Sequence, residues 1–352
     1  MAGSSAPLRL AEAVSAQAVW FPSAREVEMR AESLPDLGEN DVRVRTIASG
    51  VSHGTEMLVY RGQVPAGTGL DLPTLRGSFD FPIKYGYAAV GRVVEIGRAV
   101  NRLNVGDLVF AHHPHQTEFV VPAAMPILLP AGLNPQAGIF LANVETAINV
   151  MLDAHPRLGE RMVIFGQGVV GLLLTQLARL AGATRVVTVD PAAKRRDLSA
   201  SVGADAALAA DDHLTEQVGG MTDGRGADIV IEASGNPKAL AQALDCVAPE
   251  GTIVVCSWYG TKPVHLPLGG MFHRGRIRLV SSQVGAIAPE LSRRWDRDRR
   301  TELAREMLST LRLRQLVSHR FPFHRAADAF ALVDRSPEET VQVILTYDEA
   351  DV

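Results

Sequence analysis

Three glycines and one aspartate form the pattern in this sequence that most clearly suggests chemistry. Gly166, Gly168 and Gly171 directly follow a short apolar run, residues 162–165, and open a stretch with helical spacing. Asp190 ends the next apolar run. A G-x-G-x-x-G turn between a strand and a helix, with an acid at the end of the following strand, is typical of a dinucleotide site. A purely structural glycine turn, with the aspartate as a surface acid, is the alternative.

Each residue type has a physical task in such a site. The first glycine permits the tight turn, the second lets the backbone approach a pyrophosphate, and the third lets the helix pack closely on the strand. The pyrophosphate would face unpaired N–H groups where the helix begins, at Val169 and Val170. Asp190 can accept hydrogen bonds from ribose hydroxyls and would repel a 2′-phosphate, so we predict NAD(H) rather than NADP(H). Arg195 lies near enough to contact the nucleotide and weaken that preference.

The glycine motif lies in a stretch of alternating strands and helices. Strands are expected at 162–165, 185–189, 227–232, 252–257 and 277–281, and helices at 169–181 and 239–247. This alternation is typical of a doubly wound parallel sheet. Residues 17–129 instead show short β-rich runs separated by turn residues, which favours a partly open barrel.

The chain is therefore predicted to be an α/β protein with two domains. We place one domain at 1–150 and 288–352 and the other, the dinucleotide-binding domain, at 151–287. A helix is expected at 138–154 and another at 300–311. A strand at 341–345 is expected to pack back on the first domain.

Composition and charge exclude several classes of protein. The 352 residues are 47% hydrophobic and 21% charged, which is ordinary for a globular chain and unlike a disordered or coiled-coil one. A net charge of −4 gives no basic footprint for nucleic acid. The most apolar stretch, 162–178, is interrupted by glycine and polar residues, so no membrane span is expected. Two cysteines cannot form a disulfide framework, which suits a cytoplasmic protein.

Several segments resemble the medium-chain dehydrogenase/reductase superfamily over nearly the whole chain. They are SGVSHGTE (49–56), YGYAAVGRVVEIG (85–97), VGDLVF (105–110), the glycine motif and IVIEASGNP (229–237). The first of them, together with PHQT (114–117), is most similar to the branch that contains bacteriochlorophyllide a dehydrogenase. The resemblance implies a GroES-like barrel domain for the substrate and a Rossmann domain for the cofactor. It also implies a nicotinamide in the cleft between them, and a homodimer, with a homotetramer as the alternative, formed through the Rossmann domains.

The positions that hold zinc in other members of this superfamily are changed here. Those members carry a cysteine, a His-Glu pair and a later cysteine or glutamate, and the matching positions are Ser52, Tyr87–Ala88 and Ala142. Serine, tyrosine and alanine do not form a tetrahedral zinc site. We therefore expect a zinc-independent enzyme without a metal.

Without zinc, a hydroxyl or an imidazole must hold the substrate oxygen and move the proton. Tyr87 and Ser52 stand at former ligand positions, and His53 and Thr55 lie beside Ser52. Any of these four residues is a candidate catalytic group. A packed barrel tyrosine is the alternative for Tyr87, and a contact with the cofactor diphosphate is the alternative for His53.

Further residues are expected around the two ligands. His115, from the histidine cluster at 112–115, is expected to line the substrate cleft, together with Glu56 and Asn143. A metal at this cluster is disfavoured because only His113 and His115 would share one face of an extended segment. Three more residues are expected to contact the cofactor, and these are Thr146, Ser234 and Ser282.

Taken together, these features predict an NAD(H)-dependent, zinc-independent oxidoreductase. It would transfer a hydride between nicotinamide and a small-molecule secondary alcohol or ketone. An NADPH-dependent quinone or enone reductase is one alternative. A non-catalytic dinucleotide-binding protein, which has kept the fold without the chemistry, is another.

Overall fold

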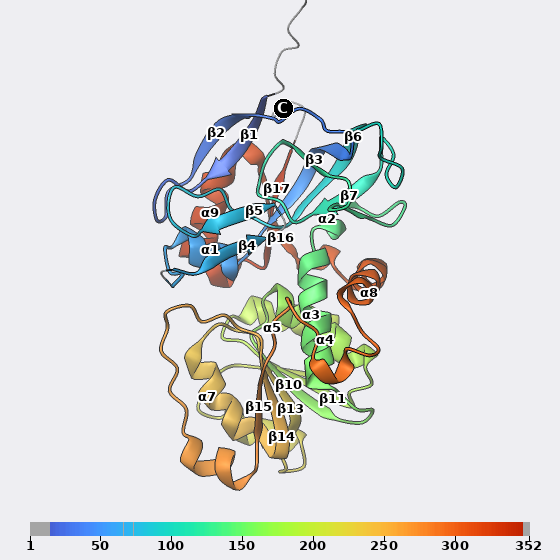
Figure 1. Ribbon diagram of the computed structural model, residues 1–352. Coiled ribbons are helices and arrows are strands. Elements are labelled where there is room, and N and C mark those ends of the chain that lie inside the picture. Colours follow the sequence, from blue (N-terminus) through green and yellow to red (C-terminus); the bar gives the residue numbers. More distant parts are fainter. Residues whose placement is uncertain (1–14, 66, 73, 348–352) are drawn as a thin grey trace, which may run out of the picture.

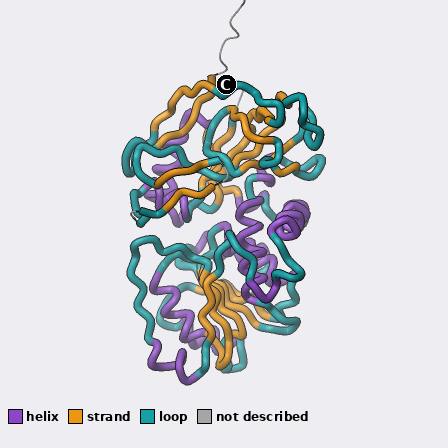
Figure 2. Tube along the Cα trace, in the orientation of Figure 1, coloured by secondary structure: helices purple, strands orange, loops and turns teal. Residues whose placement is uncertain are grey.

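The computed structural model describes residues 15–65, 67–72 and 74–347. Figure 1 shows a β-rich unit above and an α/β unit below, joined by the long helix α3 (Leu141–Ala154). Figure 2 colours the strands of both units orange and their helices purple. No helix among the described residues is long and apolar enough to cross a membrane.

The α/β unit is built on six parallel strands. Their order is β12-β11-β10-β13-β14-β15, with the bounds β10 Arg161–Phe165, β11 Arg185–Val189, β12 Ala206–Leu208, β13 Ala227–Glu232, β14 Val247–Val255 and β15 Arg278–Ser281. The helices are α4 Val169–Leu180, α5 Ala193–Val202, α6 Leu214–Met221 and α7 Pro237–Cys246. The strand order reverses between β10 and β13, which is where such sheets bind ligands. The predicted doubly wound sheet is confirmed.

The central strand β10 explains why this unit folds as two layers of helices around a sheet. Met162 and Ile164 belong to the apolar cluster that also contains α3 and α4 side chains, whereas Val163 and Phe165 belong to the cluster packed against α7. Successive side chains of a strand point to opposite faces, so a run without polar residues must be covered on both sides. The unbroken apolar run predicted from the sequence is therefore a strand that is buried on both faces of the sheet.

The β-rich unit combines segments from both ends of the described chain. Its main sheet has the order β16-β17-β3-β6-β7-β9, with β8 paired to β3. The strands are β3 Asp41–Val51, β6 Ala89–Ile96, β7 Leu108–Ala111, β8 Glu118–Pro122, β9 Ile127–Leu128, β16 Val317–Pro322 and β17 Gln342–Thr346. Because β17 runs antiparallel to β3, the end of the chain packs back on the first part, as expected from the sequence.

Smaller elements complete this unit and connect it to the sheet below. Two hairpins and three helices surround the barrel: β1 Ser15–Trp20 with β2 Glu28–Ser33, β4 Gly69–Leu72 with β5 Leu75–Ser78, and α1 Thr55–Tyr60, α2 Pro135–Gly138 and α9 Ala326–Arg335. The helix α8 (Arg297–Thr310) packs against α3. The residue bounds of the two domains stay a prediction.

Candidate functional site

The glycine turn between β10 and α4 is packed so tightly that two of its positions have no room for a side chain. Gly166 has φ +86°, and a Cβ there would lie 2.6 Å from the Cα of Ser234. A Cβ at Gly171 would lie 1.8 Å from the carbonyl oxygen of Gly166. At Gly168, directly before α4, a Cβ would meet no atom within 4 Å. The middle glycine therefore leaves open space at the N-terminus of a helix, where N–H groups favour an anion.

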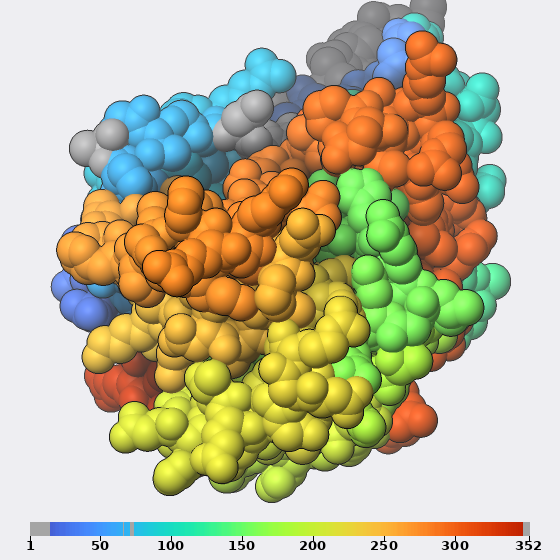
Figure 3. Space-filling model, turned by 90° about the horizontal axis from the view of Figure 1, so that it is seen from below, coloured from blue at the N-terminus to red at the C-terminus, as the bar shows by residue number. Residues whose placement is uncertain are grey.

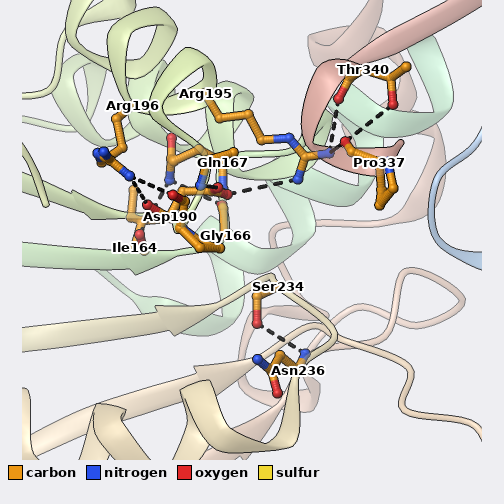
Figure 4. A network of polar contacts seen from close by, with 12 residues as sticks. Ile164, Gly166, Gln167, Asp190, Arg195, Arg196, Ser234, Asn236, Pro337 and Thr340 are labelled. Atoms are coloured by element: carbon orange, nitrogen blue, oxygen red, sulfur yellow. Dashed lines mark hydrogen bonds and ion pairs between the residues drawn. The ribbon is translucent and has the colours of Figure 1, made fainter. Parts of the chain in front are cut away.

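Asp190 lies at the base of this turn, and its carboxylate also holds the turn in shape. Its Oδ2 accepts the backbone N–H of Gln167 at 2.7 Å, and its Oδ1 accepts that of Ala192 at 2.9 Å. Figure 4 shows this network. Each carboxylate oxygen can accept a second hydrogen bond, so capacity for a ribose hydroxyl remains. The sequence indicated the ribose role, but the bonds to the turn become visible only in the structure.

Arg195 connects the sheet unit to the barrel unit beside this turn. From α5, its Nη2 donates to the carbonyl oxygen of Thr340 at 2.9 Å and also bonds that of Pro337, in the short helix η5 (Pro337–Glu339). Its Nη1 lies 3.9 Å from Asp190 Oδ2. Its Nε is buried and has no hydrogen-bond partner among the described residues.

His53 contributes a second buried nitrogen without a partner in the same region. Its Nε2 bonds to no described residue. Burial, and then the charge of Arg195, lower the pKa of His53 to about 3, so the ring is neutral at pH 7. Buried polar atoms are nearly always hydrogen-bonded in folded proteins. Two unpaired nitrogens on the two units, near an open helix N-terminus, therefore fit an oxygen-rich ligand such as a dinucleotide.

The remaining expected cofactor contacts lie on the loops after β13 and β15 and on α3. Ser234 follows β13, where its Oγ donates to Glu232 Oε1 at 2.5 Å. The same Oγ accepts the backbone N–H of Asn236 at 3.1 Å (Figure 4). The loop after β15 packs on α3, because Asn149 Nδ2 lies 3.5 Å from the Oγ of Ser282. Thr146, also on α3, donates its hydroxyl to the carbonyl of Ala142 at 2.9 Å. The structure thus places Ser282 beside α3, the helix that also carries Thr146.

Tyr87 and Ser52, two of the candidate catalytic residues, lie within hydrogen-bond reach of each other. Burial and the Glu56 carboxylate raise the pKa of Tyr87 above its ordinary value, and the Ser52 side chain opposes that rise in part. The phenol is therefore neutral, which suits a hydrogen-bond donor better than a group that gives up its proton. Thr55 begins α1 beside them, and Asn143 lies half-buried on α3. Among the described residues no group of histidine, cysteine and carboxylate side chains could hold a metal.

His115 and Glu56 belong to a closed network inside the barrel. Both side chains are 0% exposed, and His115 Nε2 lies 3.1 Å from Glu56 Oε2. The other ring nitrogen lies 2.7 Å from the Oγ of Ser49, which also contacts the hydroxyl of Tyr347 at 2.8 Å. The structure therefore places both side chains inside the barrel, where both ring nitrogens of His115 are bonded. Their expected contact with a substrate stays a prediction.

His112, which the sequence analysis named only as part of the histidine cluster, differs from its neighbours in being partly exposed. His113 is buried and stacks on Phe119 with 3.9 Å between ring centroids. The side chain of His112 keeps 29% of its surface exposed, and its Nε2 lies 3.8 Å from Glu145 Oε2. The available signal was the alternation of side chains along an extended segment, which predicts that His112 points away from the side of His113 and His115.

Two family models match consecutive parts of the chain. The alcohol dehydrogenase GroES-like domain matches residues 38–124, and the model described as zinc-binding dehydrogenase matches residues 169–297. The chain belongs to the medium-chain dehydrogenase/reductase superfamily. It is an oxidoreductase of the alcohol dehydrogenase type within that superfamily, with the GroES-like and Rossmann-like architecture expected from the sequence.

Individual relatives share this layout at low sequence identity. D-guloside 3-dehydrogenase from Escherichia coli (strain K12) is 27% identical over 328 residues, covering 88% of this chain and 93% of the relative. A zinc-binding dehydrogenase from Sinorhizobium meliloti 1021, solved with NADP, superposes with a TM-score of 0.78 at 22% identity over 95% of this chain and 99% of that one. A short chain alcohol dehydrogenase from E. coli CFT073, solved with NADH, gives a TM-score of 0.77 at 18% identity over 94% and 99%.

Proposed function

We propose that this superfamily member is an NAD(H)-dependent oxidoreductase that transfers a hydride between nicotinamide and a secondary alcohol or ketone without zinc. The observation that carries the proposal is the open turn at Gly168 with two unpartnered buried nitrogens, Arg195 Nε and His53 Nε2, in the same region. The bound dinucleotide would supply or accept the hydride. Solved relatives that contain NADP and NADH support a nicotinamide cofactor.

The protein's own residues have separate tasks in this proposal. The N-terminus of α4 would hold the pyrophosphate, and the free lone pairs of Asp190 would hold the ribose. The neutral Tyr87 phenol would donate a hydrogen bond to the substrate oxygen, with Ser52 beside it. A hydrogen bond that strengthens as charge develops on that oxygen would favour the transition state.

Binding and turnover experiments test the proposal directly. We would titrate the protein with NADH and with NADPH, followed by nicotinamide fluorescence, and then offer ketones, enones and quinones. Tight NADH binding with ketone-dependent oxidation supports the proposal. NADPH-dependent reduction of quinones or enones would favour the alternative enzyme, binding without turnover would favour a non-catalytic protein, and no binding would refute the dinucleotide site.

Replacing Asp190 with alanine is expected to weaken NADH binding by about tenfold or more, and NADPH binding by less. The reason is that the ribose loses its acceptor while the repulsion of a 2′-phosphate disappears. Fluorescence titration measures both constants, and thermal unfolding checks the turn that Asp190 holds. Asp197→Ala, an exposed acid on α5, is the matched control and should change neither constant. Equal losses for the two nucleotides would contradict the ribose role.

Purified protein is expected to contain no stoichiometric zinc, because Ser52, Tyr87 and Ala142 supply no tetrahedral set of zinc ligands. Metal analysis by inductively coupled plasma mass spectrometry would measure this, and treatment with a chelator should leave turnover unchanged. One equivalent of zinc per chain, or loss of turnover on chelation, would contradict the zinc-independent mechanism.

We also propose a homodimer formed through the edge of the α/β sheet. β15 is the last strand of that sheet, and Leu279 on it is exposed. Four further large apolar side chains are exposed nearby in the chain: Trp258, Val264, Leu268 and Met271. Figure 3 shows this amber-to-orange segment on the outer surface of the molecule. An unpaired apolar edge is a ready surface for a second copy of the same strand.

Leu279→Lys is expected to convert the dimer to a monomer, because it places a charge at the centre of that edge. Light scattering after size exclusion would measure the mass. Leu158→Lys, which alters an equally apolar and more exposed residue away from β15, should leave the dimer intact. A wild-type monomer, or dissociation of both variants alike, would contradict this interface.

A further inference from the structure

His112 is an imidazole that the chemistry proposed above leaves unused, although it lies beside Tyr87. It directly follows β7, and its carbonyl oxygen accepts the hydroxyl of Thr74 at 2.5 Å. Its ring stands edge-on to Phe110, with 5.0 Å between centroids and 89° between planes. The backbone of Tyr87 also faces the ring and favours its protonated form. His112 is thus held through both its backbone and its ring, while 29% of its side-chain surface stays accessible.

Glu145 approaches this ring from α3, one residue before Thr146. Its side chain is only 7% exposed, and its Oε1 accepts the Thr301 hydroxyl at 2.5 Å and lies 3.8 Å from Arg300 Nη2. Its Oε2 lies 3.8 Å from His112 Nε2. That separation is too long for a direct hydrogen bond, so the two groups interact through charge. Glu145 therefore joins His112 to the helix on which the nicotinamide contact is proposed.

The charges around His112 suit a group that changes protonation during a reaction. Burial is the main cause that lowers the pKa of His112, and Arg300 on α8 lowers it further. Glu145 on α3 raises it by stabilising the imidazolium. A neutral ring with a carboxylate ready to stabilise its charged form can act as a general base.

The other candidate groups are less suited to exchange a proton. His113 and His115 are buried inside the barrel, and the pKa of His53 is about 3. The phenol of Tyr87 holds its proton too firmly, for the reasons given above. His112 is the histidine near Tyr87 that combines exposure with a carboxylate partner.

We propose that His112 is the catalytic residue that exchanges a proton with the substrate oxygen, and that Glu145 is its positioning residue. The proposal rests on the oxidoreductase function proposed above. In alcohol oxidation the hydroxyl O–H bond breaks, its proton passes to the imidazole, and its electron pair forms the second C–O bond. The carbinol C–H pair leaves as hydride to the bound dinucleotide. The ring then releases its proton to water through its exposed edge, and ketone reduction reverses each change.

The pKa of His112 in the presence of each nucleotide tests this inference without a known substrate. We would label histidines with ¹³C at Cε1, assign His112 by its absence in His112→Gln, and titrate the protein with pH alone, with NAD⁺ and with NADH. If His112 faces the reacting end, the positive nicotinamide of NAD⁺ should hold its pKa about one unit below the value in NADH. Glu145→Gln should lower the pKa of His112 in every state. Exposed His213 is the internal control and should not respond.

The outcomes separate this inference from the proposed function. Failure of both nucleotides to bind would overturn the oxidoreductase function and the inference with it. Binding of both nucleotides with an identical His112 pKa, or a pKa indifferent to Glu145→Gln, would overturn only the role of His112. With any ketone that the wild type reduces, His112→Gln should keep NADH affinity and lower kcat/KM by about a hundredfold, with loss of its pH dependence. Unchanged turnover would again overturn the role of His112 alone.

Discussion

Gly171→Ala is expected to lower the free energy of unfolding by about 3 kcal/mol and to abolish measurable dinucleotide binding. The added Cβ would lie 1.8 Å from the carbonyl oxygen of Gly166 and 2.9 Å from its carbonyl carbon. Both are backbone atoms of the turn, so no side chain can rotate away. The turn must move, and Gly166 itself is already confined by the backbone of Ser234. Urea denaturation and NADH fluorescence would measure the two effects.

Gly168→Ala is the matched variant that separates folding from binding. Its Cβ meets nothing within 4 Å and its φ of −75° suits alanine, so stability should change by less than about 1 kcal/mol. The methyl group would occupy the space left for the pyrophosphate, and NADH binding should weaken by about tenfold or more. Full NADH affinity in a stable Gly168→Ala protein would show that the ligand does not use this turn.

The architecture of the α/β unit could be predicted because its signals are local. The apolar run of β10 has no alternation, and it is buried on both faces. The predicted strands at 185–189 and 227–232 coincide with β11 and β13. Strand β12 lies at the edge of the sheet and has only three half-buried residues, so its sequence carries little of that signal.

The details of the site depend on contacts between distant parts of the chain, and these leave no local pattern. Arg195 was expected near the nucleotide from its position alone, yet its guanidinium is held by carbonyls of Pro337 and Thr340. Likewise His112 and Glu145 come from different units, and only the packing of α3 on the barrel brings them together. The histidine cluster could be found in the sequence, but the face that each ring occupies could not.

His115→Leu is expected to lower the free energy of unfolding by about 3–5 kcal/mol, because it leaves the carboxylate of Glu56 buried without a partner. In the wild type Glu56 Oε2 bonds His115, while Oε1 already has no partner among the described residues. Ser49 would keep its contact with Tyr347. Urea denaturation would measure the loss, and His213→Leu, at an exposed site, should change stability by less than about 0.5 kcal/mol.

A double-mutant cycle shows whether the cost arises from the pair itself. Glu56→Leu with His115→Leu removes both polar groups, and an apolar pair of similar volume is often tolerated where a broken pair is not. The double variant should therefore lose less stability than the sum of the two single variants, by at least about 1 kcal/mol. Additive losses would mean that the two side chains do not depend on each other.

If His115 instead contacted the substrate, His115→Leu would reduce turnover while stability stayed near the wild-type value. Stability and turnover together therefore distinguish a buried role from a direct one.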